Sequence, residues 1–259
     1  MPRWGPRPRP SKGNDLAIFS KSNVRTAIAP ITSKRLKPMV READIEKVES
    51  LPAVGKREQI LNAATRVFLT HGYAGTSMER VAKASGAARR TLYNQFESKE
   101  HLFEALTERI WTNFPIFDIT RDAMSLEDPR VGLTRLGHAI AGFWMPDEAV
   151  AFLRVVISDG ERFPGLTKIF VDKGKAPAMD AIMEYLQALA ARSLIACPNA
   201  RIAGRQFLGL IDEPLLWVRV VGIDETYSKA ERHTIVDDAV DIFLRFYGIP
   251  AASPLAAHG

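Results

Sequence analysis

The sequence predicts an all-α protein with an N-terminal three-helix helix-turn-helix domain and a C-terminal helical domain. Three observations favour this fold class. Apolar residues recur at helical spacing from residue 60 onward, glycine and proline breaks divide these segments, and no stretch alternates polar and apolar residues as a half-buried strand does. At 259 residues, 46% hydrophobic and 25% charged, the chain is long enough for one or two domains with a sizeable core.

Basic residues are concentrated at the start of the chain. Residues 1–38 contain nine lysines and arginines and one acid, whereas the formal charge of the whole chain is only +5. Six prolines also fall there, and because proline lacks a backbone donor we expect residues 1–50 to be a disordered extension. Two alternatives are that translation begins at Met39, or that the segment is an arm that binds DNA phosphates.

The first predicted helix has one apolar face and is followed by a glycine. The face consists of Ile60, Ala64, Val67 and Phe68. Gly72 can end this helix in a left-handed conformation. Thr76 stands three residues before Glu79, which is the spacing of a capping box at the start of a second, shorter helix. We expect Ser85 and Gly86 to end that second helix.

Two further helices are expected over residues 87–95 and 98–114. Ser98 can cap the second of these, in which four apolar residues share a face: Leu102, Leu106, Ile110 and Phe114. Two short helices joined by a tight glycine turn and packed on a first helix form a helix-turn-helix. The second helix of such a pair can enter a DNA major groove, which is about 12 Å wide.

The outward face of the 87–95 helix carries hydrogen-bonding and cationic side chains. Arginine can pair with guanine, and asparagine or glutamine can pair with adenine. Residues 77–99 contain five basic and two acidic residues, whereas the chain after residue 38 has three more acids than bases. The local charge therefore favours DNA binding by this segment. The alternative is an ordinary solvated helix face.

This stretch resembles the DNA-binding domain of the TetR/AcrR family. The similarity runs without a gap over residues 56–100, including Gly72-Tyr73, Thr76-Ser77, Thr91-Leu92-Tyr93 and the segment 96–100. It implies a homodimeric transcriptional regulator, most often a repressor, that a small-molecule effector releases from a palindromic DNA operator. The resemblance places four residues at base-facing sites: Arg89, Arg90, Thr91 and Asn94. It places five at phosphate-facing sites: Thr76, Ser77, Tyr93, Gln95 and Lys99.

Residues 130–222 resemble the AefR-like group of TetR C-terminal domains, on the segments 152–157, 161–164 and 204–210. The resemblance implies a helical domain whose last helices pair with a second subunit. Two long apolar patterns, over about 199–222 and 229–247, are the candidates for this interface, with burial inside one subunit as the alternative. Pro214 should kink the first of them. The expected layout is an extension over 1–50, the helix-turn-helix domain over 51–100, the effector-binding and dimerisation domain over 101–248, and a loose tail over 249–259.

Several side chains of the C-terminal region are candidates for an effector pocket. Six aromatic residues could line it, with core packing as the alternative for each: Phe114, Phe143, Trp144, Phe152, Phe170 and Phe207. Arg154 lies in an apolar run and needs a partner if it is buried. That partner is expected to be Asp159 or Glu161, or alternatively an anionic effector. His138 and His233 are isolated in the sequence, so no metal site is expected.

Other classes of protein lack their signatures here. The sequence contains no glycine-rich phosphate loop and no nucleophile elbow, and its single cysteine excludes an internal disulfide. No apolar run is long enough to span a membrane, and no secretory signal is present. We therefore expect a cytoplasmic, bacterial-type regulator without a cofactor, rather than an enzyme. The alternatives are a transcriptional activator of the same family, or a helical small-molecule-binding protein or enzyme that does not bind DNA.

Overall fold

The computed structural model describes residues 55–223 and 226–249. The predicted extension over 1–50 and residues 250–259 of the predicted tail lie outside these residues. The described residues form helices, with a single isolated bridge between Ile195 and Gly248 and no β-strand, which confirms the all-α prediction. Over the same residues, no helix combines the length and the apolar character needed to cross a bilayer.

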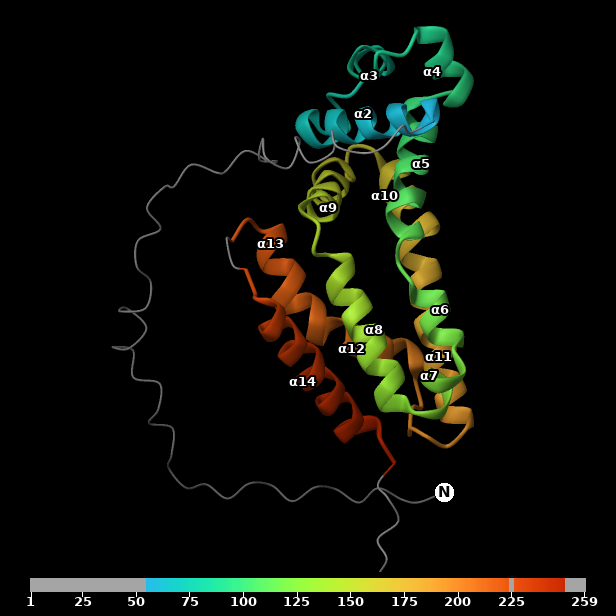
Figure 1. Ribbon diagram of the computed structural model, residues 1–259, viewed down its shortest axis with the longest axis vertical. Helices are drawn as coiled ribbons and strands as arrows, with labels where there is room; N and C mark the ends of the chain where they lie inside the picture. Colours follow the sequence, from blue (N-terminus) through green and yellow to red (C-terminus); the bar gives the residue numbers. More distant parts are fainter. Residues whose placement is uncertain (1–54, 224–225, 250–259) are drawn as a thin grey trace, which may run out of the picture. The chain divides into compact units, whose positions relative to one another are not determined.

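The predicted helix-turn-helix is present as the helices α2 (Lys56–His71), α3 (Met78–Ser85) and α4 (Arg89–Gln95), followed by α5 (Lys99–Thr112) (Figure 1). The chain turns at Gly72 and Gly86, which have φ angles of +68° and +61° that L side chains rarely adopt. Ser98 caps α5 as expected, because its hydroxyl oxygen accepts a hydrogen bond from the backbone N–H of His101 at 3.2 Å.

The predicted cap of α3 is wrong by one residue. Ser77, not Thr76, is the N-cap, and its hydroxyl oxygen accepts a hydrogen bond from the backbone N–H of Arg80 at 3.2 Å. Thr76 is 4% exposed and its hydroxyl donates instead to the carbonyl of Gly72 at 2.7 Å. Serine and threonine are both good N-cap residues. Because Thr76 is buried and bonded to Gly72, the exposed Ser77 caps α3.

The C-terminal region contains the remaining helices of the described residues. They are α6 (Ile116–Arg121), α7 (Ala123–Glu127), α8 (Pro129–Phe143), α9 (Asp147–Asp159), α10 (Pro164–Phe170), η1 (Val171–Lys175), α11 (Ala176–Ala191), α12 (Ala200–Asp212), η2 (Glu213–Trp217), α13 (Val218–Val220) and α14 (Lys229–Tyr247). η1 and η2 are π-helical. Pro214 lies in η2, where the predicted helix over 199–222 changes its hydrogen-bond pattern because proline cannot donate.

Two apolar cores hold these helices together. One joins α6, α8, α11, α12 and α14, and α8 packs directly against α12 and α14 (Figure 1). The other contains the inner faces of α2–α5, and it also includes residues of α9 and α10. Phe103 of α5 stacks on Phe152 of α9, with ring centroids 4.8 Å apart. The helix-turn-helix is therefore packed against α9 and α10 of the C-terminal region through a shared core.

Candidate functional site

The four side chains expected to face bases lie together on α4. Arg89, Arg90 and Asn94 are exposed, and Thr91 is half-buried. Leu92 is fully buried and holds α4 against the core of the helix-turn-helix. The outward side of α4 thus carries two cations and an amide, a set of groups that can bond to base edges in a major groove.

Arg89 forms an ion pair with Glu79 of α3, with Nη2 and Oε1 2.9 Å apart. The two side chains are 69% and 55% exposed, so water screens the pair and its contribution to stability is small. The guanidinium carbon also lies 5.5 Å from the centroid of the Tyr93 ring. Because the ion pair is exposed and weak, the Arg89 guanidinium can leave Glu79 and bind a DNA base or phosphate at little cost in free energy.

The five residues expected to face phosphates divide into two groups. Three of them are exposed: Ser77, Tyr93 and Gln95. The other two bond within the protein. The Thr76 hydroxyl donates to Gly72, and the Lys99 ammonium donates to the backbone carbonyl of Tyr73 at 3.0 Å and lies 4.1 Å from the centroid of the Tyr73 ring. In this structure Lys99 therefore ties the start of α5 to the turn between α2 and α3.

Tyr73 connects that turn to α9, a connection that sequence reasoning missed. Its backbone N–H donates to the carboxylate of Asp159 at 2.7 Å, and its hydroxyl donates to Glu100 Oε1 at 2.8 Å. Burial, reinforced by the hydrogen bond to Glu100 and its charge, raises the pKa of Tyr73 above its usual range. The hydroxyl therefore stays protonated as a donor. Tyr73 lies in the turn and Asp159 ends α9, 86 residues later, so no local sequence signal pairs them.

Arg109 of α5 forms a second connection that the sequence did not indicate. Its guanidinium donates to Asn62 at 2.7 Å and to Thr65 at 2.6 Å, both on α2. It also pairs with Glu58 of α2 at 3.4 Å and with Glu148 of α9 at 3.7 Å. The fork of donors on one arginine thus joins α2, α5 and α9.

Arg154 has a different partner from either of the acids expected. Its Nε donates to the carbonyl of Val220 at 3.0 Å, and an Nη donates to the carbonyl of Arg219, while Asp159 accepts from Tyr73. These carbonyls end α13, and the C-terminal end of a helix attracts a cation. The prediction of Asp159 or Glu161 as the partner is therefore wrong. Helix α9 is instead hydrogen-bonded to the end of α13 through Arg154 and to the helix-turn-helix through Asp159.

Four of the six aromatic candidates surround Trp111 at the end of α5. Its ring centroid lies 4.6 Å from Phe143, 5.9 Å from Phe170, 6.0 Å from Phe114 and 6.4 Å from Trp144. The other two pack elsewhere, Phe152 on Phe103 and Phe207 on Phe243. We call Trp111, Phe114, Phe143, Trp144 and Phe170 the Trp111 cluster.

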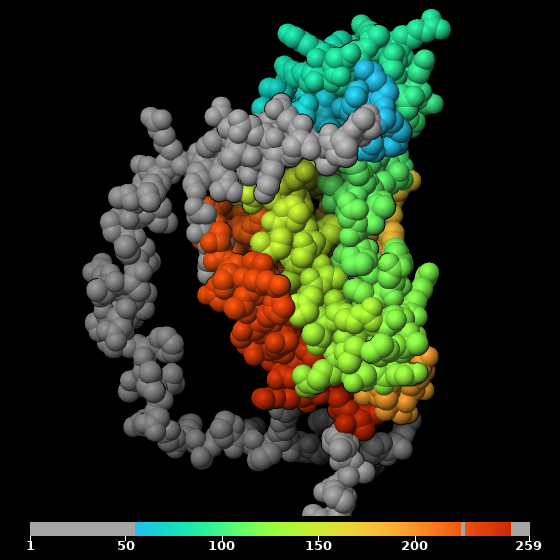
Figure 2. All heavy atoms as spheres, viewed as in Figure 1, coloured from blue at the N-terminus to red at the C-terminus, as the bar shows by residue number. Residues whose placement is uncertain are grey.

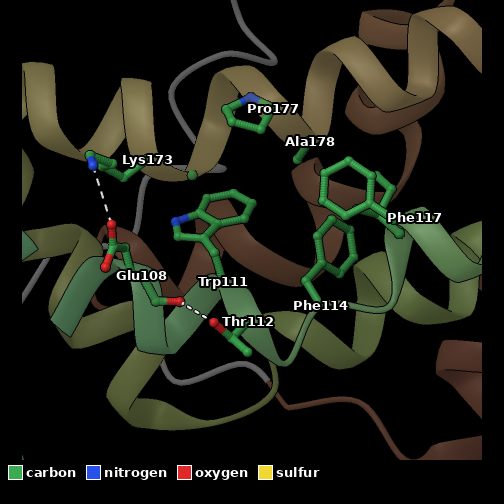
Figure 3. A pocket seen from close by; sticks show the side chains of 10 residues that line it. Glu108, Trp111, Thr112, Phe114, Phe117, Lys173, Pro177 and Ala178 are labelled. Atoms are coloured by element: carbon green, nitrogen blue, oxygen red, sulfur yellow. Dashed lines mark hydrogen bonds and ion pairs between the residues drawn. The ribbon is translucent and has the colours of Figure 1, made fainter. Parts of the chain in front are cut away.

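A pocket of about 340 Å³ lies beside this cluster, between α5, α6 and the η1–α11 segment (Figure 3). Figure 3 shows the Trp111 indole below Pro177, with the rings of Phe114 and Phe117 next to each other. The polar side chains at its edge already pair, since Lys173 donates to Glu108 at 3.2 Å. The walls combine the aromatic rings of Trp111, Phe114 and Phe117 with aliphatic and polar side chains, and sites for small organic ligands also combine apolar walls with a few polar groups.

His138 and His233 are neighbours in space, which corrects the expectation that they are isolated. Their ring centroids lie 4.4 Å apart, on α8 and α14. Burial and the neighbouring His233 lower the pKa of His138, and the charge of Asp237 opposes this. Within the part of the chain that the structure describes, no three histidines, cysteines or acids are grouped so that they could hold a metal ion.

Two family models match this chain. One, described as bacterial regulatory proteins of the tetR family, matches residues 60–106 and so covers the helix-turn-helix. The other, described as the C-terminal domain of AefR-like transcriptional repressors, matches residues 131–249. The two matches together cover the whole of the core that contains the helix-turn-helix and most of the other core.

Individual proteins agree with the family models. The repressor ComR of Escherichia coli K12 is 37% identical over 70 residues, which are 27% of this chain and 33% of ComR, so the similarity spans about a third of that relative. A Mesorhizobium loti protein described as a TetR-family transcriptional regulator is 29% identical, with a TM-score of 0.65 over 75% of this chain and 97% of that one. The flavonoid-responsive regulator FrrA is 25% identical, with a TM-score of 0.61 over 76% and 98%. With its helix-turn-helix and its helical C-terminal domain, the chain belongs to the TetR family of bacterial regulatory proteins and has the AefR-like type of C-terminal domain.

Proposed function

We propose that the protein is a sequence-specific DNA-binding transcriptional regulator that acts as a homodimeric repressor and is released from a palindromic operator by a small-molecule effector. The observation that carries this proposal is the outward face of α4. It presents Arg89, Arg90 and Asn94 to solvent from a helix-turn-helix whose apolar residues are buried in the core shared with α9 and α10. Base contacts would come from α4, and phosphate contacts from Ser77 and other exposed residues around it.

The last helices support a dimer. Figure 2 shows the segment from α13 to α14, in orange and red, on an outer face. Five large apolar side chains of α12, η2, α14 and the turn after α13 are exposed: Ile202, Trp217, Val221, Ile242 and Phe246. A soluble monomer rarely exposes a large continuous apolar surface. A second copy of the chain on this face would place two helix-turn-helix units for successive major grooves, which requires about 34–36 Å between them.

An effector would act through the helices that join the two regions. α5 runs from the helix-turn-helix to the Trp111 cluster, and α9 is bonded to both Tyr73 and the end of α13. A ligand that moves either helix changes the spacing of the two DNA-binding units. Such coupling is reciprocal, so operator DNA must weaken effector binding by the same factor. The likeness to FrrA, which responds to flavonoids, supports effector control.

Operator binding tests the proposal. The full chain selects duplexes from a random-sequence pool, and fluorescence anisotropy then compares the selected duplex with a scrambled one at two salt concentrations. Replacing Arg89 with alanine should cost about 1–3 kcal/mol with the selected duplex and relax the base preference at one position. Arg192→Ala, at the residue that follows the C-terminal end of α11, removes the same charge from an exposed site outside the helix-turn-helix and should bind as the wild type does.

Two outcomes would contradict the proposal. Selection that yields no preferred duplex would indicate a helical ligand-binding protein rather than a sequence-specific regulator. Equal losses for Arg89→Ala and Arg192→Ala would show that net charge, not α4, determines binding. A chain beginning at Met39 separates out the contribution of the basic segment, whose removal should lower the salt dependence without changing the preferred sequence. A reporter gene then distinguishes repression from activation.

A further inference from the structure

The turn between α2 and α3 is held from outside the helix-turn-helix by a carboxylate. Asp159 is the last residue of α9, and its Oδ2 atom accepts a hydrogen bond from the backbone N–H of Tyr73 at 2.7 Å. A negative side chain at the C-terminal end of a helix is electrostatically unfavourable, because the last carbonyls carry partial negative charge. Asp159 thus occupies a position that its own helix disfavours, and the N–H of Tyr73 compensates for this.

Gly72 adapts the turn to this carboxylate. Its φ angle is +68°, and a Cβ atom added there would lie 3.0 Å from Asp159 Oδ2. A larger residue would be strained by the backbone angle and would crowd the carboxylate. Phe163, between α9 and α10, also packs on the Tyr73 ring, with centroids 5.1 Å apart. The end of α9 and the segment after it therefore hold this turn together.

Along its length α9 is fixed to α13 by two arginines. Arg154 of α9 donates to two carbonyls at the end of α13. Arg219 of α13 donates in return to the carboxylate of Asp147, the first residue of α9, at 2.6 Å. The Arg219 side chain is 14% exposed, so solvent ions screen this pair less than a pair at the open surface. α13 lies between Trp217 and Val221, two exposed apolar residues of the proposed dimer face.

These bonds restrict a rotation that the other contacts allow. α5 also leads away from the helix-turn-helix, but one connecting helix does not prevent rotation about its own axis. Apolar contacts such as that of Phe103 with Phe152 are non-directional, whereas a hydrogen bond has a preferred angle. The bond from Tyr73 to Asp159 lies outside α5, so it opposes that rotation.

We propose that Asp159 is a positioning residue for operator recognition. Its bond to Tyr73 fixes the helix-turn-helix on α9, while Arg154 and Arg219 fix α9 beside the dimer face. This inference rests on the proposed function and deepens it, because it assigns the spacing of the two reading helices to α9. Successive major grooves on one face of DNA are about 34–36 Å apart. A dimer with both bonds in place accepts one half-site spacing, whereas a helix-turn-helix released from Asp159 accepts several.

Operators with altered half-site spacing test this assignment. The duplex selected from the random pool is remade with single base pairs inserted or removed between its half-sites, and fluorescence anisotropy measures each affinity. The wild type should bind the respaced duplexes about tenfold more weakly, because the DNA must be deformed to fit. In Asp159→Ala this penalty should fall below about threefold, with the preferred bases of each half-site unchanged. A residue that only stabilised the fold would leave the spacing preference as it is.

A second measurement needs no DNA. Spin labels at Ala84→Cys on α3 and Asp180→Cys on α11, in a chain that carries Cys197→Ser, report the distance between the helix-turn-helix and the C-terminal core. Diluting the labelled protein with unlabelled protein removes distances between subunits. The wild type should give one narrow distribution of distances, and Asp159→Ala a broader or displaced one. Glu161→Ala, which removes an exposed acid close to Asp159 in the chain, is the control for both measurements and should behave as the wild type.

An unchanged distance distribution in Asp159→Ala would overturn the proposal, and so would a spacing penalty as large as that of the wild type. Equal effects of Glu161→Ala would show a general response to lost charge, which overturns it as well. If Asp159→Ala fails to fold by circular dichroism, Asp159→Asn, which keeps an acceptor oxygen but not the charge, decides by both measurements. Selection of no preferred duplex would count against the proposed function, and the spin-label distances then decide the positioning role by themselves.

Discussion

Replacing Asp212 with asparagine should change how the stability of the protein depends on pH. Burial raises the pKa of this carboxyl from its usual 3.8 to about 7 in the folded state. Between these values the folded protein holds a proton that the unfolded chain releases. The free energy of unfolding therefore falls as the pH rises from about 4 to about 7 and is constant above.

The structure gives the magnitude of this effect. At about 1.36 kcal/mol for each pKa unit, ionising buried Asp212 costs the folded state about 4 kcal/mol in total. Asparagine keeps the shape of the carboxyl group and cannot ionise. The unfolding free energy of Asp212→Asn relative to the wild type should therefore increase by about 3 kcal/mol between pH 5 and pH 8.

Urea unfolding followed by circular dichroism measures this difference at each pH. The protein concentration must be the same throughout, because the stability of a dimer depends on it. Taking the difference between two proteins removes the contribution of every other titrating group. Asp180→Asn controls for the loss of one negative charge. A difference between Asp212→Asn and wild type that stays constant from pH 5 to pH 8 would refute the assignment of a buried, proton-binding carboxyl to Asp212.

Three further substitutions test other parts of the structure. Arg109→Met removes the hydrogen bonds to α2 and should lower the unfolding free energy by about 1–3 kcal/mol, whereas Arg130→Met, which breaks an exposed ion pair with Asp241, should cost less than about 1 kcal/mol. Equal losses in urea titrations would contradict the role given to Arg109. Phe246→Glu, at a side chain 76% exposed, should convert a dimer into a folded monomer in analytical ultracentrifugation, while Met124→Glu, at a side chain 64% exposed on α7, should not. Gly174→Ala should lower the unfolding free energy by about 1–3 kcal/mol, because the new methyl group overlaps the Trp111 indole. Gly209→Ala is the control, because a methyl group there has open space and should cause no such loss. An unchanged stability of Gly174→Ala would mean that η1 can move away from the indole.

Local features of the fold were predictable because they depend on residues close together in the chain. Helix periodicity located α2–α5, and Ser98 and Gly86 act at the ends expected of them. The exposure of the α4 face also followed from spacing, since Leu92 must point inward if its neighbours point outward. The misplaced cap at Thr76 shows the limit of local reasoning, because only burial distinguishes it from Ser77.

By itself, then, the sequence determined the all-helical class, the helix-turn-helix and the family. Tertiary structure decided which helix faces meet, and with them the partners of the polar side chains. Arg154 binds the end of α13 rather than a nearby acid, His138 lies against His233, and Tyr73 bonds to Asp159. Periodicity identifies the buried face of a helix but not the helix that covers it. The burial of Asp212 among aromatic rings has the same origin, because the side chains around it come from helices far apart in the chain.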